Sequence, residues 1–171
     1  MHYFAQEYGE KGMDKEGFSG RDGRTTIFDY WSVDTMCRAD EGNLTEDEKK
    51  LADIYSKLMN FARTDKTVTG LSYDLMYANP HSASFNPDRQ YAFLRRSGRQ
   101  LLVVVVNFDN LDRDILLNIP EHAFEYLKLS DGKDVMGEEI LTGESFAACL
   151  SSKQPLSIQD PKYGAAKIKI N

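Results

Sequence analysis

Residues 45–64 repeat polar and apolar side chains with the period of an α-helix. Thr45 and Glu48 have the spacing of a capping box, in which each side chain accepts a hydrogen bond from the backbone amide of the other residue. Apolar side chains then recur every three or four residues, at Leu51, Ile54, Tyr55, Leu58, Phe61 and Ala62. The pattern predicts one long helix that begins at the capping box, ends near Thr64 and carries a single apolar stripe.

After Gly70 the pattern changes from helical to alternating. Short apolar segments are separated by turn residues such as Gly98, Gly132 and Gly143, a spacing typical of an antiparallel sandwich or barrel. Residues 101–106 are apolar on both faces, so we expect them to form a central, covered strand. The predicted strands are 71–78, 91–96, 101–107, 112–119, 126–129, 139–141, 146–150, 155–158 and 165–170.

The chain before the helix contains one further strand candidate and a long loop. Residues 1–7 have the character of a buried strand that runs into a polar segment. Residues 7–43 are rich in Gly, Asp, Arg and Thr, and loops of such length are usually functional or disordered. We place the domain boundary at the end of the helix, which gives one domain over 1–69 and a second, mainly β domain over 70–171.

Composition excludes several classes of partner. The net charge is -6, and the basic residues are scattered among acids, so a nucleic-acid partner is not expected. No apolar run approaches the ~20 residues that span a bilayer, so we expect no membrane partner, and the compartment stays open. Cys37 and Cys149 form no metal-binding pair, and we expect two buried thiols. His2, His81 and His122 have no spacing that would direct them to one ion, so neither a metal site nor a cofactor is predicted.

Four segments resemble the C-terminal part of the α-amylase superfamily of glycoside hydrolases. Residues 3–10 (YFAQEYGE) are similar to the last strand of the catalytic barrel, and residues 55–63 (YSKLMNFAR) to its last helix. Residues 91–107 resemble the first hairpin of the terminal β-domain, and residues 162–168 (KYGAAKI) resemble its closing strand. The resemblance implies a mainly β chain with one long helix: an antiparallel Greek-key-type β-sandwich preceded by a remnant βα unit of a (β/α)8 barrel.

The same resemblance implies that the catalytic groups lie upstream of this chain. A retaining glycosidase needs two carboxyl groups about 5 Å apart, one as nucleophile and one as acid and base. In this superfamily those carboxylates and a supporting aspartate follow the fourth, fifth and seventh barrel strands, which all precede the segment matched here. We therefore assign no catalytic residue. The loop acids Asp14, Glu16, Asp22 and Asp29 are interpreted as ordinary solvated carboxylates.

The loop after the last barrel strand supplies the candidate sugar-binding residues, because such loops build the site in barrel enzymes. Arg21, Asp22 and Arg24 can form hydrogen bonds with sugar hydroxyls, and Tyr30 and Trp31 can stack on a sugar ring. The alternative, which we favour for the two aromatic residues, is that they hold the loop against the helix.

Two functions remain open at this point. In the first, the chain is the C-terminal part of an α-amylase-like hydrolase that acts on α-glucans and is inactive alone. In the second, it is a non-catalytic carbohydrate-binding or structural β-sandwich module. Because the helix stripe and the N-terminal strand would normally pack on a complete barrel, we also expect a homo-oligomer that buries both.

Overall fold

The computed structural model describes residues 5–10, 33–109, 111, 113–160 and 164–169. The chain divides into two compact units, Met1–Asn60 and Phe61–Asn171. The boundary predicted from the sequence, between residues 69 and 70, lies nine residues further along the chain. Each unit is described by itself.

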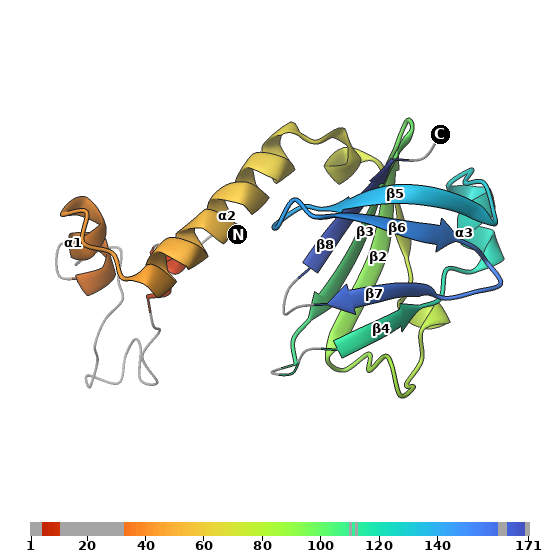
Figure 1. Ribbon diagram of the computed structural model, residues 1–171, viewed down its shortest axis with the longest axis horizontal. Coiled ribbons are helices and arrows are strands. Elements are labelled where there is room, and N and C mark those ends of the chain that lie inside the picture. Colours follow the sequence, from red (N-terminus) through yellow and green to blue (C-terminus); the bar gives the residue numbers. More distant parts are fainter. Residues whose placement is uncertain (1–4, 11–32, 110, 112, 161–163, 170–171) are drawn as a thin grey trace, which may run out of the picture. The chain divides into compact units, whose positions relative to one another are not determined.

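The described residues of the first unit form three helical elements, shown in Figure 1: the 3₁₀ turn η1 (Gln6–Tyr8), α1 (Asp34–Asp40) and most of α2 (Glu46–Thr64). The strand predicted over residues 1–7 is wrong for residues 5–7, the part that the structure describes. Ala5 has a left-handed backbone, and Gln6 begins η1. Residues 1–4 lie outside the described residues. The loop predicted over residues 7–43 is also wrong in part, since α1 occupies residues 34–40.

Helix α2 begins and ends where the sequence predicted, and the capping box forms. The amide of Glu48 donates to Thr45 Oγ1 at 3.3 Å, and the amide of Thr45 donates to Glu48 Oε2 at 2.8 Å. Arg38 of α1 holds the same carboxylate, because its Nε donates to Oε2 at 3.2 Å and its Nη2 donates to Oε1. One carboxylate therefore caps α2 and fixes α1 beside its first turn.

The paired arginine and the cap lower the pKa of Glu48 to about 2, from an ordinary value of 4.5. Because the pKa is lower in the folded state, the stabilisation is present above about pH 4.5 and is lost as the pH falls towards 2. We expect the helical circular dichroism signal of the chain to weaken over this window, and Glu48→Gln to remove that part of the pH dependence. Asp47→Asn, which changes a side chain 97% exposed in the same turn, should keep it.

The apolar stripe of α2 is present, but none of its residues is buried. Leu58 is 39% exposed and Met59 is 54% exposed. The self-association expected through this face stays a prediction. No helix among the described residues is long and apolar enough to cross a membrane.

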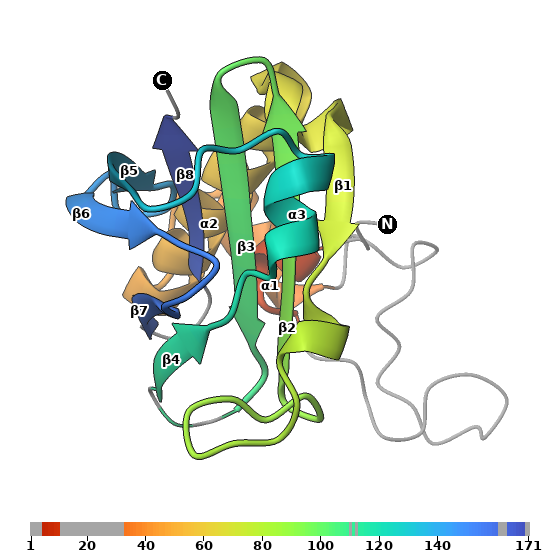
Figure 2. The ribbon, with the colours of Figure 1, turned by 90° about the vertical axis from the view of Figure 1, so that its right-hand side faces the viewer.

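The second unit is mainly β and consists of two antiparallel sheets (Figures 1 and 2). The larger sheet has the order β1-β2-β3-β8-β5-β6, and the smaller one pairs β4 with β7. The strands are β1 (Leu71–Asp74), β2 (Gln90–Ser97), β3 (Gln100–Asn107), β4 (Arg113–Leu117), β5 (Lys133–Glu139), β6 (Ser145–Leu150), β7 (Leu156–Asp160) and β8 (Gly164–Lys169). The short helical elements are η3 (Lys66–Thr69), η4 (Met76–Ala78) and α3 (Glu121–Tyr126), which lies over one face of the larger sheet (Figure 2).

Strand β3 is central, as predicted, because it pairs with β2 on one edge and with β8 on the other. Its residues Leu101, Leu102, Val103 and Val105 are buried, whereas Val104 and Val106 are only half-buried. The second face of this strand is therefore covered less completely than the apolar run predicted.

Three strand predictions are wrong in part or in whole. The strand predicted over residues 71–78 ends at Asp74, and the chain then turns into η4. Of residues 126–129, Tyr126 is the last residue of α3 and the other three follow the helix without forming a strand, with Leu129 N donating to Phe124 O at 2.8 Å. Of residues 139–141, only Glu139 is in a strand, as the last residue of β5, and the other two lie in the turn that follows; the sequence did not predict the rest of β5 as a strand.

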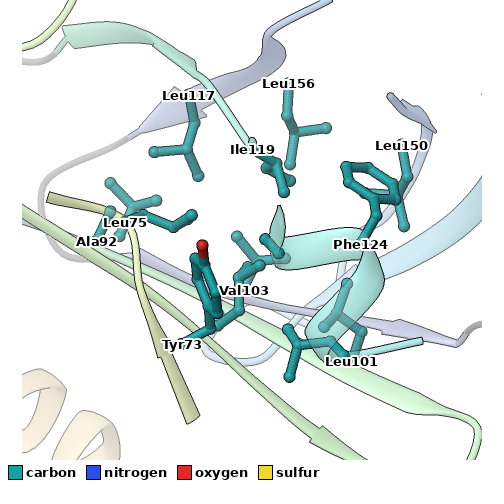
Figure 3. Close-up of a cluster of buried hydrophobic side chains, with 14 of the residues drawn as sticks. Tyr73, Leu75, Ala92, Leu101, Val103, Leu117, Ile119, Phe124, Leu150 and Leu156 are labelled. Atoms are coloured by element: carbon teal, nitrogen blue, oxygen red, sulfur yellow. The ribbon is translucent and has the colours of Figure 1, made fainter. Parts of the chain in front are cut away.

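The two sheets and α3 share one hydrophobic core. Figure 3 shows Leu117 of β4 and Leu156 of β7 directed into the same space as Val103 of β3, with Phe124 of α3 at its side. The fully buried members include Leu75, Leu94, Leu101, Ile115, Leu117, Leu127 and Leu150. The smaller sheet therefore packs on the same core as the larger sheet. Contrary to expectation, both cysteines are exposed.

Candidate functional site

The sugar-binding residues predicted from the sequence, Arg21, Asp22, Arg24, Tyr30 and Trp31, lie outside the described residues. A different group of aromatic side chains gathers in the second unit. It consists of Tyr73 on β1, Tyr77 on η4, and His122 and Tyr126 on α3. We call these four residues the aromatic patch.

The turn after β1 explains how Tyr73 and Tyr77 come together. In β1 the side chain of Tyr73 faces the core and is 8% exposed, and Leu75 is fully buried. The chain then leaves the extended conformation at η4, so Tyr77 is 64% exposed yet has its ring centroid 6.3 Å from that of Tyr73. The first tyrosine is anchored in the core, and the second stands in solvent beside it.

Helix α3 supplies the other half of the patch. Ala123, Phe124 and the following Leu127 are buried, which fixes the inner face of the helix. His122 and Tyr126, four residues apart, therefore share an outer face, with ring centroids 6.5 Å apart. Their rings lie 5.7 and 5.8 Å from that of Tyr73, which stands between the helix and η4.

A chain of hydrogen bonds runs through the patch. The hydroxyl of Tyr73 contacts the hydroxyl of Tyr77, and it lies 2.9 Å from Nδ1 of His122. Tyr73 has one hydroxyl proton and so can donate to only one of these neighbours. When His122 is neutral with its proton on Nε2, Tyr77 donates to Tyr73 and Tyr73 donates to Nδ1. The patch then presents an acceptor on Tyr77 and a donor on His122.

Tyr73 remains protonated under ordinary conditions. Burial raises the pKa of its hydroxyl to about 12, and the hydrogen bond with Tyr77 acts in the same direction. The group therefore serves as a neutral bridge between the two exposed residues rather than as a source of negative charge.

The described residues contain no group of three or more His, Cys, Asp or Glu side chains placed to hold a metal ion. His81 lies in a loop with Nε2 3.3 Å from Asp88 Oδ2, and His122 belongs to the aromatic patch. His2 lies outside the described residues. The two described histidines thus have different, separate surroundings.

The chemistry of the patch suits binding of a neutral polar ring rather than bond cleavage. Tyr77 and Tyr126, 64% and 47% exposed, offer apolar ring faces, and the hydrogen-bond chain offers fixed polar groups at their edge. A flat apolar surface with a few placed polar groups is how proteins bind neutral ligands of this kind.

The sequence contained a signal for only half of this patch. His122 and Tyr126 are four residues apart, a spacing that puts two side chains on one face of a helix, but the strand predicted over 126–129 separated them. Tyr73 and Tyr77 come together only through the turn from β1 into η4, which no local signal predicted.

No family model matches the chain, and no curated protein matches it. Two of the solved structures that share its fold are the following. One, AmyP in complex with maltose, has a TM-score of 0.50 at 15% identity, over 75% of this chain and 22% of that protein. The other, a noncanonic maltogenic α-amylase, AmyB from Thermotoga neapolitana, has a TM-score of 0.50 at 10% identity, over 71% of this chain and 26% of that protein. The chain thus has an amylase-like fold and spans about a quarter of the length of these two proteins.

Proposed function

We propose that this chain is the C-terminal part of an α-amylase-like glycoside hydrolase that acts on α-glucans. The observation that carries the proposal is the unequal coverage, in which about three quarters of this chain matches about a quarter of a much longer amylase. In this proposal residues 1–69 are the remnant of a catalytic barrel, with its last loop and helix, and residues 70–171 are a Greek-key β-sandwich. The sharing of one core by the two antiparallel sheets supports the second assignment.

The proposal further holds that the chain is inactive alone, because the resemblance places the catalytic carboxylates upstream of it. We expect no release of reducing sugar when the purified chain is incubated with soluble starch or maltooligosaccharides. Measurable hydrolysis that a single carboxylate substitution abolishes would contradict this. Addition of an α-amylase to the same mixture controls for substrate quality.

A second function, glucan binding without cleavage, is favoured by the aromatic patch. Its two exposed tyrosines lie on elements far apart in the sequence, and a buried tyrosine connects them to His122. Exposed aromatic residues that are held in place lose little conformational entropy on binding, which makes them effective contact surfaces. In this proposal the patch holds an α-glucan while another part of the protein acts on it.

Native electrophoresis in gels with and without soluble starch tests the patch. We expect the chain to be retarded, and the double variant Tyr77→Ala/Tyr126→Ala to lose about thirtyfold in apparent affinity, since each of the two aromatic contacts contributes about 1 kcal/mol. Tyr91→Ala is the matched control, because Tyr91 is 45% exposed on β2 and lies outside the patch. Absence of retardation, or equal loss in the control, would exclude this function.

A further inference from the structure

A groove in the second unit is lined by cations, although the chain as a whole carries a net charge of -6. Its volume is about 620 Å³, within the range of small-ligand sites. Four basic residues are among its described lining: Arg96, Arg99, Lys128 and Lys133. They come from β2, the β2–β3 turn, the segment after α3 and the start of β5, so the fold brings together charges that are distant in the sequence.

Arg96 is the fixed element of this groove. Its Nε donates to the carbonyl of Gly98 at 2.9 Å, and its Nη1 donates to the carbonyl of Lys128 at 2.7 Å and to that of Leu127. These bonds tie the β2–β3 turn to the end of α3. An arginine has five donors, and the two on Nη2 have no acceptor among the described residues.

Lys128 is placed by the end of α3. It has a left-handed backbone, φ 51°, which a lysine adopts only at a conformational cost. Its amide donates to Glu125 O at 3.1 Å, and its own carbonyl accepts from Arg96. The backbone of this lysine is therefore held at both ends at the edge of the groove.

Asp134 is the carboxylate among the described lining residues, and it interacts with Cys149 rather than with the cations of the groove. Asp134 lies opposite Cys149 of β6 in the strand register, and it contributes both a hydrogen bond and a negative charge to the surroundings of that thiol. No ion pair joins Asp134 to any of the four cations within the described part of the chain. The groove therefore keeps an excess of positive charge.

The remaining lining is a hydroxyl and an apolar floor. Ser130 supplies the hydroxyl, and Val135, Met136 and Leu150 contribute apolar surface, with Met136 60% exposed. None of the described lining residues is aromatic, so this part of the groove lacks the stacking surface that a nucleobase would use. Multiple cations beside a hydroxyl and a modest apolar floor suit a phosphate group carried on a small, non-aromatic body.

We propose that this groove binds a small phosphate monoester of the sugar phosphate class, with the phosphate held by Arg99, Lys128 and Lys133 beside the anchored Arg96. The site is separate from the aromatic patch, and it does not depend on the proposed glucan chemistry. Attraction to the phosphate is partly screened by salt, so binding should weaken as ionic strength rises.

Isothermal titration calorimetry of the full chain tests the proposal, with glucose 6-phosphate, inorganic phosphate and glucose as separate ligands. We expect saturable binding of glucose 6-phosphate, weaker binding of inorganic phosphate and none of glucose. Lys133→Gln and Lys128→Gln should each weaken binding about tenfold, because each removes a charge-assisted contact. Arg96 is left unchanged, since it holds the fold of the groove.

Lys153→Gln is the matched control, because it removes the same charge at an exposed position of the same unit that does not line the groove. Unchanged binding in this variant supports the site, whereas equal weakening would mean a general effect of net charge and would overturn the proposal. Equal affinity for inorganic phosphate and glucose 6-phosphate would overturn the sugar phosphate assignment. Absence of saturable binding at millimolar ligand would overturn the site itself.

Discussion

Replacing Leu117 with alanine is expected to lower the free energy of unfolding of the second unit by about 3 to 5 kcal/mol. Leu117 is fully buried at the end of β4, among core residues that include Val103 and Leu156 (Figure 3). Removing its terminal carbons leaves a cavity where the smaller sheet meets the rest of the core. The loss then has two parts, the transfer of apolar surface and the contacts around the cavity.

The adjacent residue provides the control. Leu116 has the same side chain in the same strand but is 42% exposed, because successive residues of a strand face opposite sides. Leu116→Ala should therefore cost about 1 kcal/mol or less. Denaturation followed by near-ultraviolet circular dichroism measures both, since tyrosines lie in the folded unit. Equal losses in the two variants would mean that the smaller sheet does not share the core.

Helix α2 could be predicted because its signals are local. The capping box of Thr45 and Glu48 lies within one turn, and the stripe that follows needs only the chain's own period. Strand β3 was equally accessible, since an apolar run on both faces has few other places than the middle of a sheet. The ion pair of Glu48 with Arg38 could not be predicted, because α1 lies in a segment whose sequence shows no clear periodicity.

Strand β5 and helix α3 were missed because tertiary contacts decide them. β5 begins with Lys133 and Asp134 and contains Gly137, a composition that argues against a strand, yet it pairs with β6 and β8 on its two edges. A Cβ at Gly137 would lie 2.3 Å from Cζ of Phe146, so a larger residue there would require the Phe146 ring to move. Helix α3 has six residues, too few for periodicity to identify it.

The candidate sites were hidden for a related reason. In an uninterrupted strand Tyr73, Leu75 and Tyr77 would all face one side, whereas the turn into η4 leaves Tyr77 exposed. The cations of the groove come from four segments, and only the register of the sheet and the end of α3 bring them together. Neither arrangement follows from spacing along the chain.

Asn79 links η4 to the segment that leads into α3, and its replacement is the second change from which we expect a large effect. Its side chain is 1% exposed. Its Nδ2 donates to Leu75 O at 2.8 Å and to Asn118 O at 3.0 Å, and its Oδ1 accepts from Asn118 N at 2.7 Å. One buried amide thus satisfies three backbone groups.

Asn79→Leu keeps a side chain of similar size but leaves those backbone groups without partners, so we expect a loss of about 2 to 4 kcal/mol. The control is Asn118→Ala, because the side chain of Asn118 is exposed and only its backbone takes part in these bonds. Hydrogen exchange gives the sharper measurement, since the amide of Asn118 should exchange faster in Asn79→Leu. Because this amide also fixes η4 against the approach to α3, the same variant should weaken starch retardation, whereas Asn118→Ala should retain it. Loss of stability with unchanged retardation would mean that the aromatic patch forms without this link.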